Sequence, residues 1–313
     1  MSDAHFSPPG REDRAARRSY IFGGHSVDVG RIAAGLYVVA TPIGNLGDIT
    51  LRALTTLAGA DLIACEDTRV TRKLLDRYAI TTPLMPYHDH NAATARPKLL
   101  RRLAEGAAIA LVSDAGTPLI SDPGYKLVRA AQQAGYAVTA LPGASAPLAA
   151  LAVAGLPTDQ FFFTGFLPPK QAARRARIGE LARIPATVVL FETGPRLAAT
   201  LADLAAGFGD REAALCRELT KLHEEVRRGD LAALAQQIGA SEIRGEMVIV
   251  IAPPPASERP QAGDADVLLR QALARVSLKD AVGEVASATG LPRRELYQRA
   301  LALTKEDNHG AAR

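Results

Sequence analysis

The sequence predicts an α/β protein of two α/β lobes followed by a small helical module. Three observations lead to this fold class. Short β-branched segments alternate with helical patterns from Leu36 onward, Pro168-Pro169 interrupts the alternation, and the chain beyond Asp264 carries helical patterns only. Alternating strands and helices are typical of a parallel sheet covered by helices. With 313 residues, 48% hydrophobic and 22% charged, the chain is long enough for two lobes and unlike a disordered or fibrous protein.

The changes of pattern set the expected boundaries. Residues 1–31 mix proline, glycine, arginine and aspartate without a periodic apolar face, so we expect a poorly ordered extension there. The first α/β lobe is expected over residues 32–166 and the second over residues 167–255, with Pro168-Pro169 as the hinge between them. The helical module is expected over residues 264–313.

Each lobe is assigned its elements from apolar periodicity. In the first lobe we expect strands at 36–40, 61–65, 109–113, 137–141 and 161–164, and helices at 50–58, 69–78, 96–105, 125–134 and 145–154. In the second lobe we expect strands at 187–191, 213–217 and 247–251, and helices at 196–206 and 230–238.

The helical module has the pattern of a helix-turn-helix. Ser277 is a suitable cap for a helix, Thr289-Gly290 predicts a turn, and Pro292 is suited to begin a second helix. A purely structural helical hairpin is the alternative, because residues 264–313 carry eight cations against seven anions.

Charge and cysteine usage limit the classes of partner. The chain has 37 Lys and Arg against 33 Asp and Glu, a net charge of +4, and the five cations and one glutamate of residues 164–185 account for the same +4. This segment favours an anionic partner. The longest apolar run, 148–156, is shorter than the roughly 20 residues that cross a bilayer, so no membrane span is expected. Cys65 and Cys216 lie in apolar runs without metal spacing, which favours a reducing cytoplasm.

Three glycine-containing loops follow predicted strands, at 40–48, 113–118 and 141–146. Open α/β sheets bind ligands at the carboxyl ends of their strands, so these loops form the candidate site. Taken singly, each could be an ordinary turn. None matches G-x-G-x-x-G or G-x-x-x-x-G-K-[ST], so neither a dinucleotide nor a triphosphate fingerprint is present.

These loops and several further segments resemble the ribosomal RNA small subunit methyltransferase I family, within the tetrapyrrole methylase superfamily. The resemblance rests on VATPIGNLGDITLRA, CEDTR, SDAGTPLISDPG, LPGASA, FTGFLP, FETGPRL, LTKLHEEVRRG and RGEMVIVI, which occur in family order between Leu36 and Ile251. It implies two α/β lobes with a cleft between them, S-adenosylmethionine as methyl donor and a homodimer. It also implies 2'-O-methylation of a cytidine in the decoding region of 16S ribosomal RNA, as naked RNA or in the small ribosomal subunit.

The resemblance also implies which residues contact the donor. It indicates Pro42, Asp114, Gly116, Thr117, Ser145, Ala146, Phe191, Glu192 and Leu222, the last three from the second lobe. Such a pocket needs hydrogen-bond acceptors, backbone groups and apolar walls but no metal ion. His88 and His90 have one neighbouring carboxylate and no further cluster, so we expect no metal there either.

Methyl transfer to a hydroxyl depends mainly on orientation, and a general base can add to it. The candidate bases are Glu66, Asp67, His88 and Glu224. A surface ion pair with Arg69 or Arg72 is the alternative role for either acid of the CEDTR motif, and a plain loop histidine is the alternative for His88.

Two groups of arginines are expected to contact RNA phosphates: Arg174, Arg175 and Arg177 on a helical pattern, and Arg293 and Arg294 at the start of the last helix. Solvated helix charges are the alternative. Two other functions remain open at this stage. A small-molecule porphyrinoid methylase would share the fold, although Thr41-Pro42-Ile43-Gly44-Asn45 departs from the Gly-Pro-Gly-Asp type expected there. A non-catalytic nucleic-acid regulator would explain the helical module and leave both lobes without a role.

Overall fold

The computed structural model describes residues 18–239, 243–255, 262–289 and 291–310. They form two compact units. The first unit comprises the described residues up to Ala149 together with Leu219–Leu222, and the second comprises Ala150–Glu218 and the described residues from His223 onward. In the part of the chain that the structure describes, no helix is both long and apolar enough to span a membrane.

A β-hairpin precedes the first sheet. Strands β1 (Ser19–Phe22) and β2 (His25–Asp28) pair in antiparallel fashion. Tyr20 is only 5% exposed and packs into the core of the first unit. Arg18 donates to Oδ1 of Asp61 at 2.6 Å. The expected poorly ordered extension is therefore wrong for residues 18–31, because these long-range contacts leave no periodic signal in the sequence; residues 1–17 lie outside the described part.

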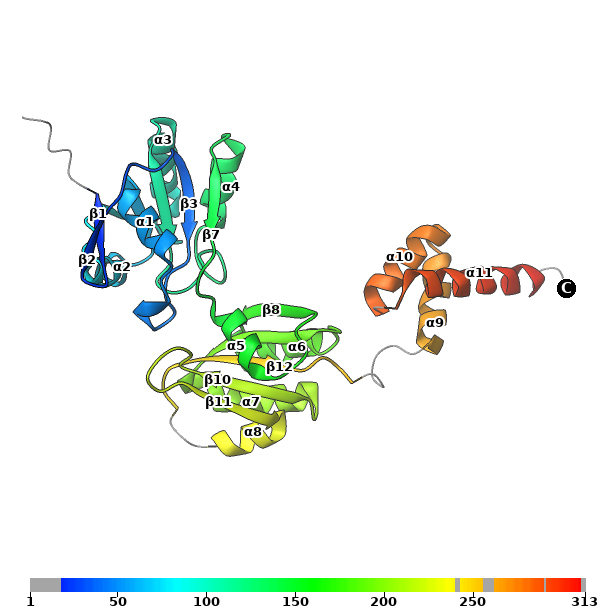
Figure 1. Ribbon diagram of the computed structural model, residues 1–313. Helices are drawn as coiled ribbons and strands as arrows, with labels where there is room; N and C mark the ends of the chain where they lie inside the picture. Colours follow the sequence, from blue (N-terminus) through cyan, green and yellow to red (C-terminus); the bar gives the residue numbers. More distant parts are fainter. Residues whose placement is uncertain (1–17, 240–242, 256–261, 290, 311–313) are drawn as a thin grey trace, which may run out of the picture. The chain divides into compact units, whose positions relative to one another are not determined.

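The first unit contains a fully parallel five-stranded sheet (Figure 1). Its strands are β3 (Gly35–Val39), β4 (Leu62–Cys65), β5 (Leu84–Pro86), β6 (Ala108–Val112) and β7 (Val138–Leu141), in the order β5-β4-β6-β3-β7. All five residues of the central strand β6 are buried, as both faces of the sheet are covered. The predicted parallel α/β layer is confirmed for this unit, although the short strand β5 was not predicted.

Helices cover both faces of this sheet. One face packs against α1 (Leu51–Gly59) and α2 (Thr68–Arg77), and the other against α3 (Ala92–Ala104) and α4 (Tyr125–Gln133). A short 3-10 turn, η1 (Leu46–Asp48), precedes α1. Thr50 caps α1 by accepting the N–H of Ala53 at 3.1 Å. This doubly covered arrangement leaves the ends of the parallel strands as the natural place for a site.

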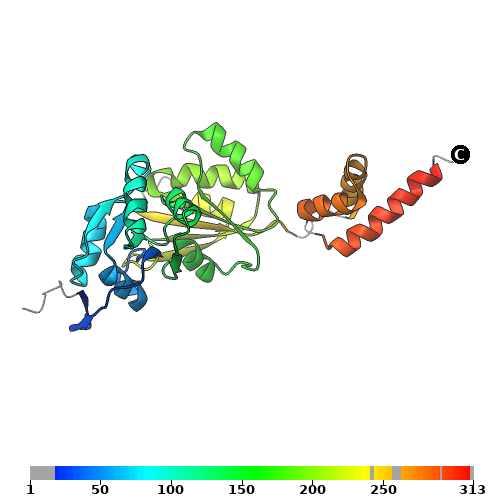
Figure 2. The same cartoon turned by 90° about the horizontal axis from the view of Figure 1, so that it is seen from above.

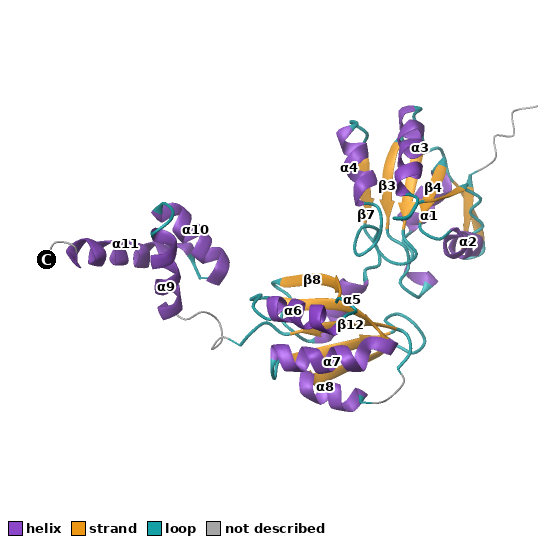
Figure 3. Cartoon of the chain, turned by 180° about the vertical axis from the view of Figure 1, so that it is seen from behind, coloured by secondary structure: helices purple, strands orange, loops and turns teal. Residues whose placement is uncertain are grey.

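The second unit contains a mixed five-stranded sheet. Its strands are β8 (Phe161–Phe166), β9 (Thr187–Thr193), β10 (Glu212–Arg217), β11 (Glu225–Asp230) and β12 (Glu246–Ile251), in the order β11-β10-β12-β9-β8. Only the pair of β8 and β9 is parallel. Helices α6 (Gln171–Leu181), α7 (Gly194–Phe208) and α8 (Leu231–Ile238) pack on one face (Figure 3).

The predicted boundary between the lobes is wrong. Segment 161–164 was expected in the first sheet, but β8 pairs with β9 in the second. The units divide between Ala149 and Ala150, inside α5 (Ala146–Ala154), and not at Pro168-Pro169. The apolar run of β8 identifies a strand, whereas its sheet is decided by hydrogen bonds to a partner that the local sequence does not specify.

Three helices form the C-terminal module: α9 (Ala262–Leu273), α10 (Leu278–Thr289) and α11 (Arg293–Gly310), shown in Figure 2. Leu269, Val285 and Leu296 are buried in its own core. The Ser277 hydroxyl accepts the N–H of Asp280 at 3.3 Å, as expected of a cap. The predicted helix pair is confirmed; Gly290 of the predicted turn lies outside the described residues.

Candidate functional site

The candidate site lies at the carboxyl edge of the parallel sheet in the first unit. Strands β4, β6, β3 and β7 are neighbours in that order, so the loops that follow them meet at one edge. The loops after β3, β4 and β6 begin where a mostly buried apolar strand ends, and the third predicted loop begins at the buried Leu141 of β7. The edge therefore gathers short polar side chains and glycine backbone in one place.

Hydrogen bonds join the three predicted loops directly. Thr41 and Gly116 exchange two backbone hydrogen bonds, of 2.8 and 3.0 Å, which link the loop after β3 to the loop after β6. The hydroxyl of Thr117 donates to the carbonyl of Ala144 at 3.2 Å and links the second loop to the third. The loops thus form one connected surface.

Glycine is required where these loops come closest. A Cβ on Gly143 would lie 2.8 Å from Cβ of Ala40, and Gly116 has a left-handed φ of 78° with Ile43 Cγ2 only 3.3 Å from the position of its missing Cβ. The loop after β6 also holds Leu119 at φ 75° and Ser121 at φ 64°. Non-glycine residues in this region cost free energy and concentrate at functional sites.

Carboxylates from two neighbouring strands interlock at the edge. Oδ1 of Asp114 accepts the N–H of Asp67 at 2.9 Å, and the N–H of Asp114 donates to the Glu66 carboxylate. Burial raises the pKa of Glu66, and the charges of Asp114 and Asp122 raise it further. Asp114 itself is an exposed residue. The edge is acidic and suits a ligand that carries positive charge.

Asp122 belongs to this cluster and was missed by the sequence reasoning. Burial raises the pKa of its carboxyl group; a hydrogen bond from Ser113 opposes that shift, and the charge of Asp114 adds to it. Asp122 lies within the SDAGTPLISDPG segment, but nothing in the neighbouring sequence distinguishes it from an ordinary turn residue. In the folded chain, the loop that contains Leu119 and Ser121 places the Asp122 carboxylate within hydrogen-bond reach of Ser113.

The other candidate bases have different surroundings. Hydrogen bonds from Arg69 lower the pKa of Asp67 to about 2, and Asp67 also caps α2. The alternative of an ion pair with Arg69 is thus the one that the structure shows. The Nδ1 atom of His88 is buried without a hydrogen-bond partner in the described part of the chain. Glu224 is exposed in the second unit.

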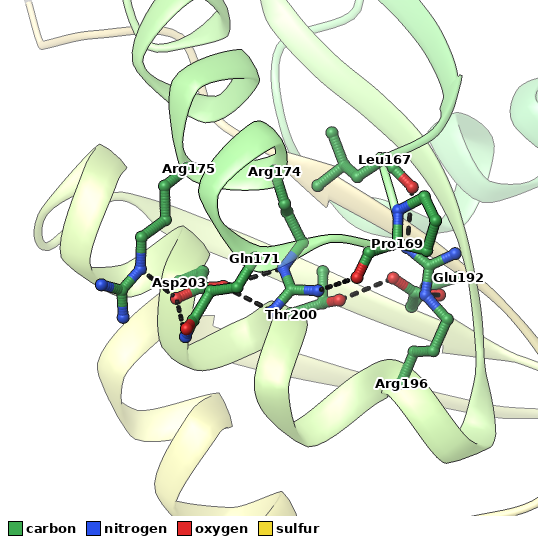
Figure 4. A network of polar contacts seen from close by, with 9 residues as sticks. All are labelled: Leu167, Pro169, Gln171, Arg174, Arg175, Glu192, Arg196, Thr200 and Asp203. Atoms are coloured by element: carbon green, nitrogen blue, oxygen red, sulfur yellow. Dashed lines mark hydrogen bonds and ion pairs between the residues drawn. The ribbon is translucent and has the colours of Figure 1, made fainter.

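The donor contacts expected from the second lobe are distributed differently. Glu192 is 1% exposed, and its carboxylate accepts from the Thr200 hydroxyl at 2.6 Å and lies 3.2 Å from Nε of Arg196 (Figure 4). It also accepts the N–H of Thr193 at 2.8 Å. Its oxygens are therefore used in holding the start of α7. The Phe191 ring packs against Phe163 and Phe166. Leu222 is 92% exposed and clusters with the first unit.

The arginines of α6 divide into a buried and an exposed group. Arg174 is 5% exposed and forms an ion pair with Asp203 at 2.6 Å (Figure 4). Its guanidinium group is not available to a phosphate, so the structure corrects this expectation. Arg175 shares Asp203 but is 62% exposed, and Arg177 pairs with Glu180 at the surface. These two remain candidates for RNA contact.

In the C-terminal module, Arg293 and Arg294 are exposed at the start of α11. A helix N-terminus attracts anions, so their position suits a phosphate. Across the described residues, no group of three His, Cys, Asp or Glu side chains could hold a metal ion.

Two family models match parts of this chain, and named relatives are similar to most of it. Residues 35–235 match the family model described as Tetrapyrrole (Corrin/Porphyrin) Methylases, and residues 259–304 match the RsmI C-terminal HTH domain. The chain is 50% identical over 277 residues to the Ribosomal RNA small subunit methyltransferase I of Mesorhizobium japonicum, covering 88% of this chain and 94% of that protein. It is 51% identical over 272 residues to the protein of the same name from Erythrobacter litoralis, covering 87% and 96%.

Solved structures are similar in fold at lower identity. A cobalt precorrin-4 methyltransferase of cobalamin biosynthesis aligns with a TM-score of 0.53 at 19% identity, over 69% of this chain and 94% of that one. A diphthine synthase aligns with a TM-score of 0.54 at 17% identity, over 69% and 89%. At this level of identity the likenesses concern the fold alone.

Proposed function

The chain belongs to the ribosomal RNA small subunit methyltransferase I family of tetrapyrrole methylases, and from this membership we propose that it methylates ribosomal RNA of the small subunit with S-adenosylmethionine. The acceptor we propose is the 2'-hydroxyl of a cytidine in the decoding region. The match to the RsmI C-terminal HTH domain favours this function over a porphyrinoid methylase, because a small-molecule enzyme has no use for a nucleic-acid module.

The carboxyl edge of the first sheet fits this donor. S-adenosylmethionine supplies an electrophilic methyl group on a positively charged sulfonium, and the exposed carboxylate of Asp114 suits its cationic groups. Gly116 and Gly143 keep side chains away from the edge, while buried Pro42 offers an apolar wall. Thr117, Ser145 and Ala146 complete the proposed contacts. Phe191 and Glu192 stay in the proposal as residues that hold their neighbours in place, by ring packing and by hydrogen bonds. The exposed Leu222 stays a proposed donor contact.

Orientation of the acceptor hydroxyl is the main catalytic requirement. Glu66 is the strongest of the candidate proton acceptors, since its raised pKa lets it take up a proton more readily than the ion-paired Asp67. His88 and Glu224 are weaker candidates, because the Nδ1 atom of His88 is buried and Glu224 is an exposed residue of the second unit.

RNA contact, assembly and location complete the proposal. We propose phosphate contacts for Arg175, Arg177, Arg293 and Arg294, which are all at least partly exposed. A homodimer is supported by three exposed aromatic side chains on the edge strand β8, namely Phe161, Phe162 and Phe166. A cytoplasmic location follows from the proposed substrate.

The single observation that carries this proposal is the 50% identity to a named relative, over 94% of that protein's length. The contact of the loops at one sheet edge is consistent with it. The test incubates the protein with labelled S-adenosylmethionine and either small ribosomal subunits, naked 16S RNA or a porphyrinoid acid. Label in the RNA at a single 2'-O-methylcytidine, mapped by nuclease-resistant dinucleotide analysis, is the expected result. Label in the porphyrinoid alone would establish the alternative.

Asp114→Asn is expected to weaken donor binding while the loops stay folded. The asparagine retains an oxygen for the N–H of Asp67 but loses the charge, and loss of a charged hydrogen bond costs about 1.5–3 kcal/mol. Calorimetric titration with S-adenosylmethionine measures the effect. Asp76→Asn, an exposed carboxylate on α2, is the matched control. Unchanged affinity in a folded Asp114→Asn protein would remove this residue from the donor site.

Changing Arg175 and Arg177 together to glutamine is expected to weaken RNA binding without affecting the donor. Each lost contact to single-stranded RNA flattens the slope of log affinity against log salt by about 0.7, so two contacts give roughly 1.4. Fluorescence anisotropy over a salt series measures the slope. Gln replacement of Arg183, outside α6, is the control. A slope equal to that of the unmodified protein would make both arginines ordinary helix charges.

A further inference from the structure

A loop between two strands of the second unit contributes residues to the first. Leu219–Leu222 connect β10 to β11, yet they cluster with the first unit. Leu219 is 7% exposed, so the segment is packed at its start, whereas Leu222 at its end is 92% exposed. Thr220 and Lys221, the next two residues of the chain, are partly buried.

Glu218 anchors this loop at its base. Its N–H donates to the carbonyl of Glu246 at 3.0 Å, and its carboxylate accepts the N–H of Glu246 at 2.9 Å. A Cβ on Gly245 would lie 2.5 Å from that carboxylate, so the absence of a side chain there makes room for it. Arg217 adds a hydrogen bond from Nε to the carbonyl of Arg244 at 2.9 Å. The turn before β12 thus fixes the position of the loop.

The anchored loop is held in a strained conformation. Glu218 has φ 48° and Thr220 has φ 66°, both left-handed. In the part of the chain that the structure describes, five non-glycine residues have positive φ, and four of them lie either here or at Leu119 and Ser121 in the loop after β6. Backbone strain concentrated in these two loops indicates positions held for function.

Lys221 lies directly over the loop after β3. Gly44 has φ 155°, and a Cβ built on it would contact the Cγ of Lys221, with Cε at 2.7 Å and Cδ at 3.0 Å. The aliphatic stem of the lysine therefore occupies the space that the glycine leaves. Residues 40–48 contain no lysine or arginine, so Lys221 brings a cation to a loop that has none of its own.

We propose that Lys221 contacts the reacting nucleotide of the RNA, with its ammonium group bound to an anionic oxygen of the phosphate beside the acceptor hydroxyl. This inference rests on the proposed function and extends it to a residue of the acceptor side. The carboxylates Glu66, Asp114 and Asp122 make the β4–β6 side of the edge suitable for the positively charged donor. A lysine at the β3 loop suits the polyanion and would repel a sulfonium.

Lys221→Met tests the proposal because it keeps the length of the stem and removes the charge. With saturating donor, we expect the single-turnover rate of RNA methylation to fall by about 10²-fold, the effect of misplacing the acceptor hydroxyl by about 1 Å. Lys221→Arg should recover most of the rate. Lys126→Met, an exposed lysine on α4 of the same unit, is the matched control. Thermal unfolding shows that each variant is folded.

Two binding measurements accompany the rates. Donor affinity by calorimetry should be unchanged in Lys221→Met, and the salt slope of RNA binding should flatten by about 0.7 for the one lost contact. An unchanged methylation rate overturns the proposal. A parallel loss of donor affinity also overturns it and assigns Lys221 to the donor carboxylate. If the unmodified protein methylates no RNA, the proposed function fails, and the salt slope alone then decides whether Lys221 contacts RNA.

Discussion

Asp203→Ala is expected to lower the free energy of unfolding of the second unit by about 3–5 kcal/mol, the cost of leaving a buried charge without its partner. Asp203 is 2% exposed and accepts from Nε of Arg174 at 2.8 Å and Nε of Arg175 at 2.7 Å. Removing the carboxylate leaves the Arg174 guanidinium buried with the carbonyl of Pro169 as its remaining partner among the described contacts. Urea unfolding followed by circular dichroism measures the loss.

Arg175→Gln is the control for this variant. Arg175 is 62% exposed, and exposed ion pairs are worth about 0–1 kcal/mol, so the change should have little effect. The double change Arg174→Met with Asp203→Leu should recover much of the stability, because apolar replacement of both partners removes the unpaired charge. An Asp203→Ala protein as stable as the unmodified one would show that the pair is dispensable.

The same pair makes stability sensitive to acid. Burial by itself would raise the pKa of Asp203, but hydrogen bonds from Arg175 and Arg174 and their charges lower it below its ordinary value. A lowered folded-state pKa means that the stabilisation is complete above the unfolded pKa of about 3.9 and disappears as the pH falls through the folded value. The pair therefore contributes fully at neutral pH.

Gly194→Ala is expected to destabilise the second unit by at least about 3 kcal/mol, at the upper end of overpacking effects. Gly194 begins α7, and its N–H donates to the carbonyl of Gly245 at 3.2 Å. An added Cβ would overlap the carbonyl oxygen of Ile243, with the carbonyl carbon at 2.8 Å and Cα of Arg244 at 3.1 Å. These atoms are backbone, so no rotamer change relieves the contact.

Gly179→Ala is the matched control within α6. A Cβ at Gly179 meets no atom within 4 Å, so alanine should stabilise the helix by about 0.5–1 kcal/mol. If packing decides both effects, thermal unfolding will show a lower Tm for Gly194→Ala and a higher Tm for Gly179→Ala than for the unmodified protein. Equal effects at the two positions would mean that the backbone at Gly194 moves aside without cost.

The sequence was most informative where the signal is local. Apolar runs such as 109–113 predict buried strands, and turn residues after them predict the loops, so the carboxyl ends of four of the five strands of the first sheet were found to within one residue, while β5 was missed. Helix caps were also local: Ser277 caps α10 as expected. The family motifs then indicated Asp114 and Gly116 at the edge where the structure has them.

What could not be predicted depends on distant partners. Strand β11 is polar, Glu225–Asp230, and forms only because β10 offers it hydrogen bonds. The charge of Arg174 was visible, but its burial depends on Asp203 in another helix. Lys221 could not be linked to Gly44 because 177 positions separate them, the difference of the two residue numbers. Such contacts are properties of the folded chain and leave no periodic trace.

The position of Leu219–Leu222 has a consequence for synthesis on the ribosome. All strands and donor loops of the first unit have been translated by Ala149, but the segment that completes this unit follows about 70 residues later in the chain, as the residue numbers show. A nascent first unit therefore emerges without Lys221, and Gly44 stays uncovered until β10 and the turn before β12 have been made. The order of translation thus delays a complete acceptor side until most of the second unit exists.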